Sequence, residues 1–334
     1  MPFVLADRIL KLGYAYREAK VLMSAVELGV FSALAEEPLD LDALMESIRI
    51  DRRGARDFFD ALVALGLLDR DASGRYACTP ETAFYLDRRK ESYQGDDLEF
   101  NAQQYGRWNL LTRALKSGKP QNAVAVKGNF PVLYTDPVAL QSFAKAMSVA
   151  SRPVGVALAE KFPWSRYRTV VDVGSARGAL LVEVTSVYSH LTGGGFDLPP
   201  MKPLFESYVR EHGLSDRLQF YPGNFFDEPL PGGDVLVLGR VLHDWNLETK
   251  KMLLNKAHAA LPTGGALIVY ERLIDDERRT HAAGLLSSLN MLVMTEGGFD
   301  FTAADGIAWM REAGFHDMKV EPLTSDQAMV VGVK

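Results

Sequence analysis

The sequence predicts an α/β protein with two parts: a helical N-terminal domain and a doubly wound, mostly parallel sheet. Three observations carry this prediction. The chain has 334 residues, more than one compact core usually holds. Residues 1–105 have apolar residues at helical spacing, and from Tyr167 onward short apolar runs alternate with helical patterns. We expect domains at 1–105 and 166–334, joined by helices in 106–165.

The N-terminal part predicts a winged-helix unit. Apolar residues at helical spacing cover 9–34, an acid-capped helix start follows at 39–48, another helix at 51–68, and a short hairpin at 68–79. A winged helix either binds DNA or serves as an interaction domain. Three arginines of the second helix are balanced by Asp51, Asp57 and Asp60, whereas a recognition helix needs uncancelled cations. The charge balance favours the interaction domain.

The composition also bounds the class of protein. A net charge of −6 argues against a general binder of nucleic acid or anionic membranes. Cys78 is the single cysteine, so the chain has no internal disulfide, and a cytoplasmic setting fits. Charges at Asp7, Arg8 and Lys11 interrupt the first apolar run, and we expect neither a signal peptide nor a membrane span. The six histidines lack metal-ligand spacing, so we expect no metal.

The middle and the C-terminal part follow in order. The stretch 136–162 predicts a long helix, apolar on one side, that lines whatever lies between the domains. Five strands are expected at 169–174, 193–198, 218–223, 234–241 and 265–273, with helices between them. Residues 318–334 form two further strands around a short polar turn, which predicts an antiparallel hairpin.

Ligands of doubly wound sheets bind at the carboxyl ends of the strands. The first strand ends in a G-x-x-x-G turn between Gly174 and Gly178, which is weak by itself because any tight strand-to-helix turn needs such glycines. Asp197 ends the second strand, where a carboxylate accepts ribose hydroxyls or caps a turn. Asn224 follows the third strand beside two phenylalanines, which suits an adenine ring.

The motifs "VDVGSARG", "FDLP", "GNFF" and "VLHDW" together resemble the S-adenosylmethionine-dependent methyltransferases. More narrowly, the chain is similar to small-molecule O-methyltransferases, which include plant caffeate and flavonoid enzymes and bacterial antibiotic-tailoring enzymes. The similarity covers nearly the whole chain, since that family also has a winged-helix dimerisation domain. It implies a Rossmann-like seven-stranded methyltransferase sheet with a terminal antiparallel hairpin, S-adenosylmethionine as cofactor, S-adenosylhomocysteine as product, and a homodimer.

The resemblance assigns a set of cofactor-binding residues. They are Asp172, Gly174, Ser175, Gly178, Asp197, Leu198, Asn224, Phe225, Gly239, Arg240 and Trp245. Three positions depart from the family pattern. The family loop Gly-Gly-Gly-x-Gly is Gly-Ser-Ala-Arg-Gly here, an acid for the adenine amine is Asn224, and a lysine four residues before the histidine is Gly239. Arg240 contacts either the cofactor or an acidic neighbour, and Trp245 packs on the adenine or seals the core.

His243 is the expected general base, because a phenol is mostly protonated at neutral pH and histidine can take its proton. Glu271 lies 28 residues later, near the end of the fifth strand, and is adjacent to His243 if the two strands are neighbours. The resemblance adds Asp300 as a second flanking acid. Alternatively, His243 bonds a backbone carbonyl and Glu271 pairs with Arg272 or Arg278 on the surface. We expect Asp244 to cap the next helix.

The resemblance and the helical pattern place an acceptor pocket between the sheet and nearby helices. Its expected lining residues are Met147, Met291, Met294 and Trp108, with Tyr105 and Phe130 as weaker candidates. The hypothesis is a homodimeric, cytoplasmic O-methyltransferase that methylates a phenolic hydroxyl of an aromatic small molecule in secondary metabolism. The alternatives are a C- or N-methyltransferase or a base-free variant on this scaffold, and, more remotely, a winged-helix regulator with a vestigial cofactor domain.

Overall fold

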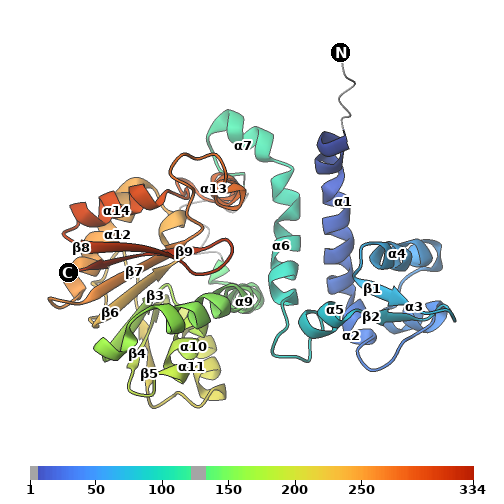
Figure 1. Cartoon of the computed structure of the whole chain (residues 1–334), viewed down its shortest axis with the longest axis horizontal. Helices are drawn as coiled ribbons and strands as arrows, with labels where there is room; N and C mark the ends of the chain where they lie inside the picture. Colours follow the sequence, from blue (N-terminus) through green and yellow to red (C-terminus); the bar gives the residue numbers. More distant parts are fainter. Residues whose placement is uncertain (1–6, 122–132) are drawn as a thin grey trace. The chain divides into compact units, whose positions relative to one another are not determined.

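The computed structural model describes residues 7–121 and 133–334, so the candidate pocket residue Phe130 lies outside the described residues. The chain divides into two compact units, one ending at Tyr105 and the other beginning at Gly106 (Figure 1). The finer role given to residues 106–165, lining the acceptor pocket, stays a prediction.

The first unit has the helices and the hairpin that the sequence predicts. Its elements are α1 (Asp7–Leu28), α2 (Val30–Ala33), α3 (Leu41–Ile48), α4 (Arg52–Ala64), β1 (Leu68–Arg70), β2 (Tyr76–Cys78), α5 (Pro80–Tyr85) and most of α6 (Gly95–Trp108). Gly29 has a φ of 76° and divides the first apolar stretch into two helices. Asp40 and Asp51 cap α3 and α4 through backbone amides. A core of twelve buried residues, including Phe31, Phe59 and Leu62, holds these elements together.

The second unit is a seven-stranded sheet with helices on both faces. Its strands are β3 (Thr169–Val173), β4 (Thr192–Asp197), β5 (Leu218–Pro222), β6 (Val235–Gly239), β7 (Ala266–Glu271), β8 (His316–Pro322) and β9 (Ala328–Val333). Their order is β5-β4-β3-β6-β7-β9-β8, and only β9 runs antiparallel to its neighbours, β7 and β8. This arrangement confirms the predicted fold class, including the terminal antiparallel hairpin.

Helices cover the two faces of the sheet in separate layers (Figure 1). On one face lie α9 (Pro137–Lys161), α10 (Ala179–Val187) and α11 (Lys202–Glu211), and on the other α12 (Leu247–Ala260) and α14 (Ala303–Glu312). Alternate residues of β6 serve the two layers: Val235 and Val237 pack in the first core, and Leu236 and Leu238 in the second. Two further helices are α7 (Leu111–Ser117) and α13 (Ala282–Met294), and three short 3-10 turns are η1 (Trp164–Arg166), η2 (Pro199–Met201) and η3 (Leu242–Asp244).

The fourth predicted strand ends earlier than the sequence suggested. We expected it to run to Val241, but β6 ends at Gly239. Arg240 has a φ of 53°, in the left-handed region, and this turns the chain out of the sheet before Val241. The turn carries the following residues, η3 among them, over the carboxyl ends of β6 and β7.

In the residues that the structure describes, every helix is too short or too polar to cross a membrane.

Candidate active site

His243 lies in η3, at the carboxyl end of β6, and is 6% exposed. Glu271, the last residue of β7, lies beside it, because β6 and β7 pair in parallel and their carboxyl ends meet. The Nδ1 atom of His243 lies 3.4 Å from Glu271 Oε2 and 3.4 Å from Asp300 Oδ1. The backbone amide of His243 also donates to Glu271 Oε1 at 3.2 Å. The structure therefore brings the three predicted catalytic side chains together in one buried cluster.

The two acids face a single nitrogen of the ring. Glu271 and Asp300 are 0% and 1% exposed, and the second oxygen of each lacks a hydrogen-bond partner in the described part of the chain. A proton on Nδ1 can be donated to Asp300 Oδ1 and is attracted by the nearby Glu271 Oε2, and it leaves Nε2 with a lone pair directed away from both acids. The surface alternative for Glu271 is wrong, since Arg272 pairs with Asp326 instead, at 2.7 Å.

The cluster perturbs the titration of its members. Burial by itself would lower the pKa of His243, but the carboxylate of Glu271 is the largest opposing influence, and the net result is a pKa of about 9. Burial raises the pKa of Glu271, while the charge of His243 opposes this rise. The free site thus favours an imidazolium at neutral pH, held between buried carboxylates, which must lose its proton before Nε2 can act as a base.

Asp244 does not cap the next helix, contrary to the sequence prediction. The N-cap of α12 is Asn246, whose side chain accepts from the amide of Thr249 at 2.9 Å. Asp244 instead lies against His243, with Oδ1 3.7 Å from Nε2. Both residue types cap helices well, but Asp244 is the last residue of η3, and Asn246, two residues later, is the one at the helix start.

The acid-bearing segment between α13 and α14 packs directly on the η3 turn. A Cβ at Gly298 would lie 2.6 Å from the carbonyl oxygen of His243 and 2.7 Å from that of Asp244. Only glycine permits this approach, which brings Asp300 within reach of the imidazole. The ligand atoms of His243, Glu271 and Asp300 lie within 4.8 Å of one another, so the same group has the atoms to hold a cation.

The loop after β3 is organised by Asp197 at the end of β4. Asp197 Oδ2 accepts from the amide of Ala176 at 2.9 Å, and Oδ1 accepts from the amide of Leu198 at 2.7 Å. Ala176 has a φ of 45°, a left-handed conformation that disfavours residues other than glycine. Burial raises the pKa of Asp197 to about 6 and that of Asp172 to about 7.

Tyr134 is a residue of this region that the sequence analysis missed. Its hydroxyl donates to Asp197 Oδ1 at 2.8 Å. A carboxylate has about four lone-pair sites, and Tyr134 with the two amides occupies three of them. Two ribose hydroxyls need two sites, so the carboxylate fits a nucleoside once the Tyr134 bond is released. No local pattern links residues 134 and 197, and only the fold reveals the contact.

Gly239 stands where the related family has a lysine, and the residue beside it in the sheet explains the glycine. Gly239 pairs in register with Tyr270 of β7, and a Cβ at position 239 would lie 1.9 Å from Cε1 of the Tyr270 ring. The tyrosine ring thus occupies the space that a side chain at position 239 would need. Arg240 bonds Tyr270 only through its backbone amide, and its buried Nε lacks a hydrogen-bond partner among the described residues.

The predicted adenine-side residues lie together. Trp245 makes edge contacts with Phe225 and Phe226, at centroid distances of 5.7 and 4.9 Å. The Asn224 amide donates to Asp227 at 2.7 Å and its oxygen accepts from the amide of Phe226, so it holds its own turn. Whether these residues bind the cofactor stays a prediction.

The predicted acceptor residues fall into two groups. Trp108 Nε1 donates to Asn290 of α13 at 3.1 Å, and α13 also carries Met291 and Met294. Met147 lies on α9, where its neighbour Ser148 accepts from Arg177 Nε of the cofactor loop at 2.5 Å. One group thus lies on or against α13, and the other lies beside the loop after β3.

The order of this sheet, with a buried acid–imidazole cluster and a buried carboxylate at the carboxyl ends of its strands, is the arrangement expected of a methyltransferase with a nucleoside cofactor. Comparison with known proteins agrees. Residues 108–316 match the O-methyltransferase domain, and residues 10–88 match the O-methyltransferase dimerisation domain. The chain belongs to the O-methyltransferase family and is an S-adenosylmethionine-dependent enzyme of that family.

Three relatives illustrate the similarity. The tetracenomycin polyketide synthesis 8-O-methyl transferase TcmO of Streptomyces glaucescens is 40% identical over 327 residues, covering 98% of this chain and 96% of TcmO. The N,N-dimethyltransferase OxyT of Streptomyces rimosus is 35% identical over 338 residues, covering 100% and 98%. The crystal structure of human N-acetylserotonin methyltransferase in complex with S-adenosylmethionine superposes with a TM-score of 0.91 at 28% identity, covering 100% and 99%.

Proposed function

We propose that the enzyme methylates a hydroxyl group of a polycyclic aromatic acceptor, with Nε2 of His243 as the general base. The observation that carries the proposal is the position of Nδ1, 3.4 Å from each of two buried carboxylates. These acids fix the ring, hold a proton on Nδ1 and stabilise the imidazolium that forms when Nε2 accepts the acceptor's proton. S-adenosylmethionine, when bound, supplies the activated methyl group.

Asp197 and the loop that it organises are proposed to hold the ribose of the cofactor, and Phe225 and Trp245 to contact the adenine. Support comes from the buried carboxylate of Asp197 at the carboxyl end of β4, where ligands of such sheets bind. We also propose that the reaction needs no metal. Unchanged turnover after dialysis against a chelator would agree, and activity restored by one divalent cation would contradict it.

The acceptor class is inferred from the relatives. TcmO acts in the synthesis of a polyketide, and it is similar to this chain over nearly its whole length. Trp108 and the methionines of α13 offer flat and adaptable apolar contacts for fused rings. OxyT is described as an N,N-dimethyltransferase, and this likeness keeps methylation at nitrogen as the second candidate.

The decisive experiment compares wild-type enzyme with His243→Ala, using a panel of hydroxylated and aminated naphthalenes and anthraquinones. Loss of a general base lowers the rate by about 10²–10⁴-fold. We expect this loss for hydroxyl acceptors, with S-adenosylhomocysteine affinity in calorimetry unchanged within about threefold. An unchanged rate would establish a base-free mechanism, and turnover of amines alone would establish the nitrogen alternative.

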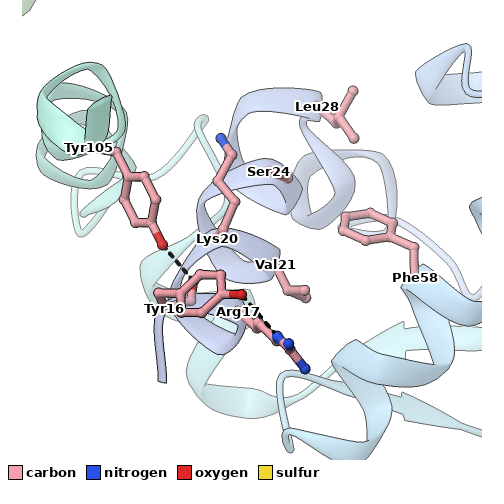
Figure 2. A pocket seen from close by; sticks show the side chains of 8 residues that line it. All are labelled: Tyr16, Arg17, Lys20, Val21, Ser24, Leu28, Phe58 and Tyr105. Carbon is pink, nitrogen blue, oxygen red and sulfur yellow. Dashed lines mark hydrogen bonds between the residues drawn. The ribbon is translucent and has the colours of Figure 1, made fainter. Parts of the chain in front are cut away.

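The dimerisation domain is proposed to form a homodimer through α1. An open groove of about 510 Å³ lies along this helix. Figure 2 shows side chains that line it, among them Tyr16, Val21, Leu28 and Phe58. Ile9 and Leu12 of the same helix are 75% and 79% exposed in the single chain, and contact of such apolar side chains with water is unfavourable. Light scattering should show a dimer for wild type and a monomer for the double variant Ile9→Glu, Leu12→Glu. Val187→Glu, also at an exposed apolar position, is the matched control.

DNA binding by the winged-helix unit receives no support from its charges. Arg52 of α4 pairs with Asp42 at 2.9 Å, and Arg56 lies 3.7 Å from Asp60. These pairs neutralise two of the three arginines that a recognition helix would present to phosphates. Salt-sensitive retention of the protein on duplex DNA would revive the regulator hypothesis.

A further inference from the structure

Lys250 is a buried cation that neither the sequence analysis nor the base mechanism uses. It is 0% exposed and stands in the first turn of α12. Both features lower the free energy of unfolding unless other contacts compensate. Burial removes the hydration of the ammonium group, and a cation near a helix N-terminus opposes the helix dipole. Helix propensity and solubility therefore do not explain the residue, and its compensation must come from tertiary contacts.

Those contacts join two segments of the catalytic cluster. The ammonium group of Lys250 donates a short hydrogen bond to the carbonyl oxygen of Trp245, two residues after His243. The same nitrogen lies 3.7 Å from the centroid of the Phe299 ring, one residue before Asp300. The ring of Phe301, on the other side of Asp300, is 5.8 Å away.

The charge of Lys250 also complements the cluster. The carboxylates of Glu271, Asp300 and Asp244 attract this charge from a distance. Among the described residues, none of the three forms an ion pair with Lys250 within 4.0 Å. Burial lowers the pKa of Lys250 to about 8, and the three acids oppose that shift. A second cation thus lies beside a cluster in which acids outnumber the single imidazole.

We propose that Lys250 is a positioning residue for the methyl-transfer reaction: its ammonium group clamps the His243 turn to the Asp300 segment and places a positive charge beside the acids of the cluster. The proposal rests on the proposed role of His243 as base. Lys250 itself touches neither cofactor nor acceptor in this role, and acts through the geometry and charge of the cluster. Its removal should change the rate of the chemical step more than it changes binding.

The test uses the full-length enzyme with S-adenosylmethionine and 1-naphthol as probe acceptor. Lys250→Met removes the charge and the donor while keeping the length of the side chain, and Lys250→Arg restores a cation. For Lys250→Met we expect kcat to fall about tenfold or more and S-adenosylhomocysteine affinity to stay within about threefold. The midpoint of the pH–rate profile should move to higher pH, since loss of a neighbouring cation favours the imidazolium. Lys250→Arg should recover part of kcat.

The neighbouring Lys251 provides the matched control. It lies on the same helix, is partly exposed, and pairs with Glu312 on the surface at 2.6 Å. Lys251→Met should leave kcat and the pH profile unchanged. Lys250→Met with a kcat within twofold of wild type would overturn the proposal, and so would a parallel loss of kcat and cofactor affinity. If Lys250→Met does not fold, Lys250→Gln, which keeps a donor without the charge, decides by the same measurements.

A double-mutant cycle separates this proposal from that for His243. If Lys250 acts through His243, Lys250→Met should cause no further loss in kcat on a His243→Ala background. Losses that multiply would overturn the positioning role while leaving the base assignment intact. A fully active His243→Ala enzyme would instead overturn the base assignment itself.

Discussion

The pairing of His243 with Glu271 predicts a specific response to the variant Glu271→Gln. The amide is isosteric, and its oxygen can still accept from the His243 backbone amide, so we expect the fold to persist. What disappears is a negative charge 3.4 Å from Nδ1. At an effective dielectric constant of about 20, this attraction amounts to about 5 kcal/mol, an upper bound of between three and four pH units. Asp300 remains in place, and we therefore expect a shift of about two units.

The assay is the pH dependence of kcat/KM for a naphthol acceptor, because this ratio reports titration of the free enzyme. In the wild type the rate should rise with pH through the pKa of His243, about 9, as the imidazolium loses its proton. In Glu271→Gln the midpoint should move to lower pH by about two units, while the plateau falls about 10²-fold because the amide disturbs the Nδ1–H tautomer. Glu248→Gln, an exposed change in α12, is the control. A lower plateau with an unmoved midpoint would refute the electrostatic reasoning.

Three further predictions concern the cofactor loop, the strand pair and the stability. Tyr134→Phe frees a lone pair of Asp197, so calorimetry should show S-adenosylhomocysteine binding about two- to tenfold tighter, and weaker binding would mean that the tyrosine bond persists in the complex. Gly239→Ala forces a Cβ into the ring of Tyr270 and should cost about 1–3 kcal/mol in urea unfolding, whereas an unchanged midpoint would contradict the contact. Because the folded-state pKa of His243 lies above its ordinary value, its stabilising contribution is complete below about pH 6.5 and is lost as pH rises through about 9. The loss of stability between pH 6 and pH 9.5 should thus be smaller in His243→Asn.

Much of the catalytic unit could be predicted from the sequence, because its signals are local. Apolar runs mark the strands, and polar residues follow their ends, which is why His243, Glu271 and Asp197 could be predicted to lie at the carboxyl edge of the sheet. The parallel pairing of β6 and β7 then supplied the contact that the sequence prediction of a His243–Glu271 pair required.

The missed features depend on tertiary contacts. Lys250 lies in the stretch "LETKKM", whose charges are typical of a solvated helix face, and its burial is decided by Phe299 from a distant segment. The early end of β6 follows from the left-handed backbone conformation of Arg240, which cannot be predicted from the residue type. Asp244 and Asn246 are equally good capping residues by type, and only the geometry of η3 distinguishes them.

The contact between Gly239 and Tyr270 also limits how this chain can change by descent. One volume is shared by two positions on adjacent strands, so a larger side chain at 239 meets the ring, and a smaller one at 270 leaves a hole in the sheet edge. Single substitutions at either site therefore pass through a less stable protein. Replacing this pair by a long residue at one position and a small residue at the other requires both substitutions together. Positions 239 and 270 should therefore change in a correlated way and not independently.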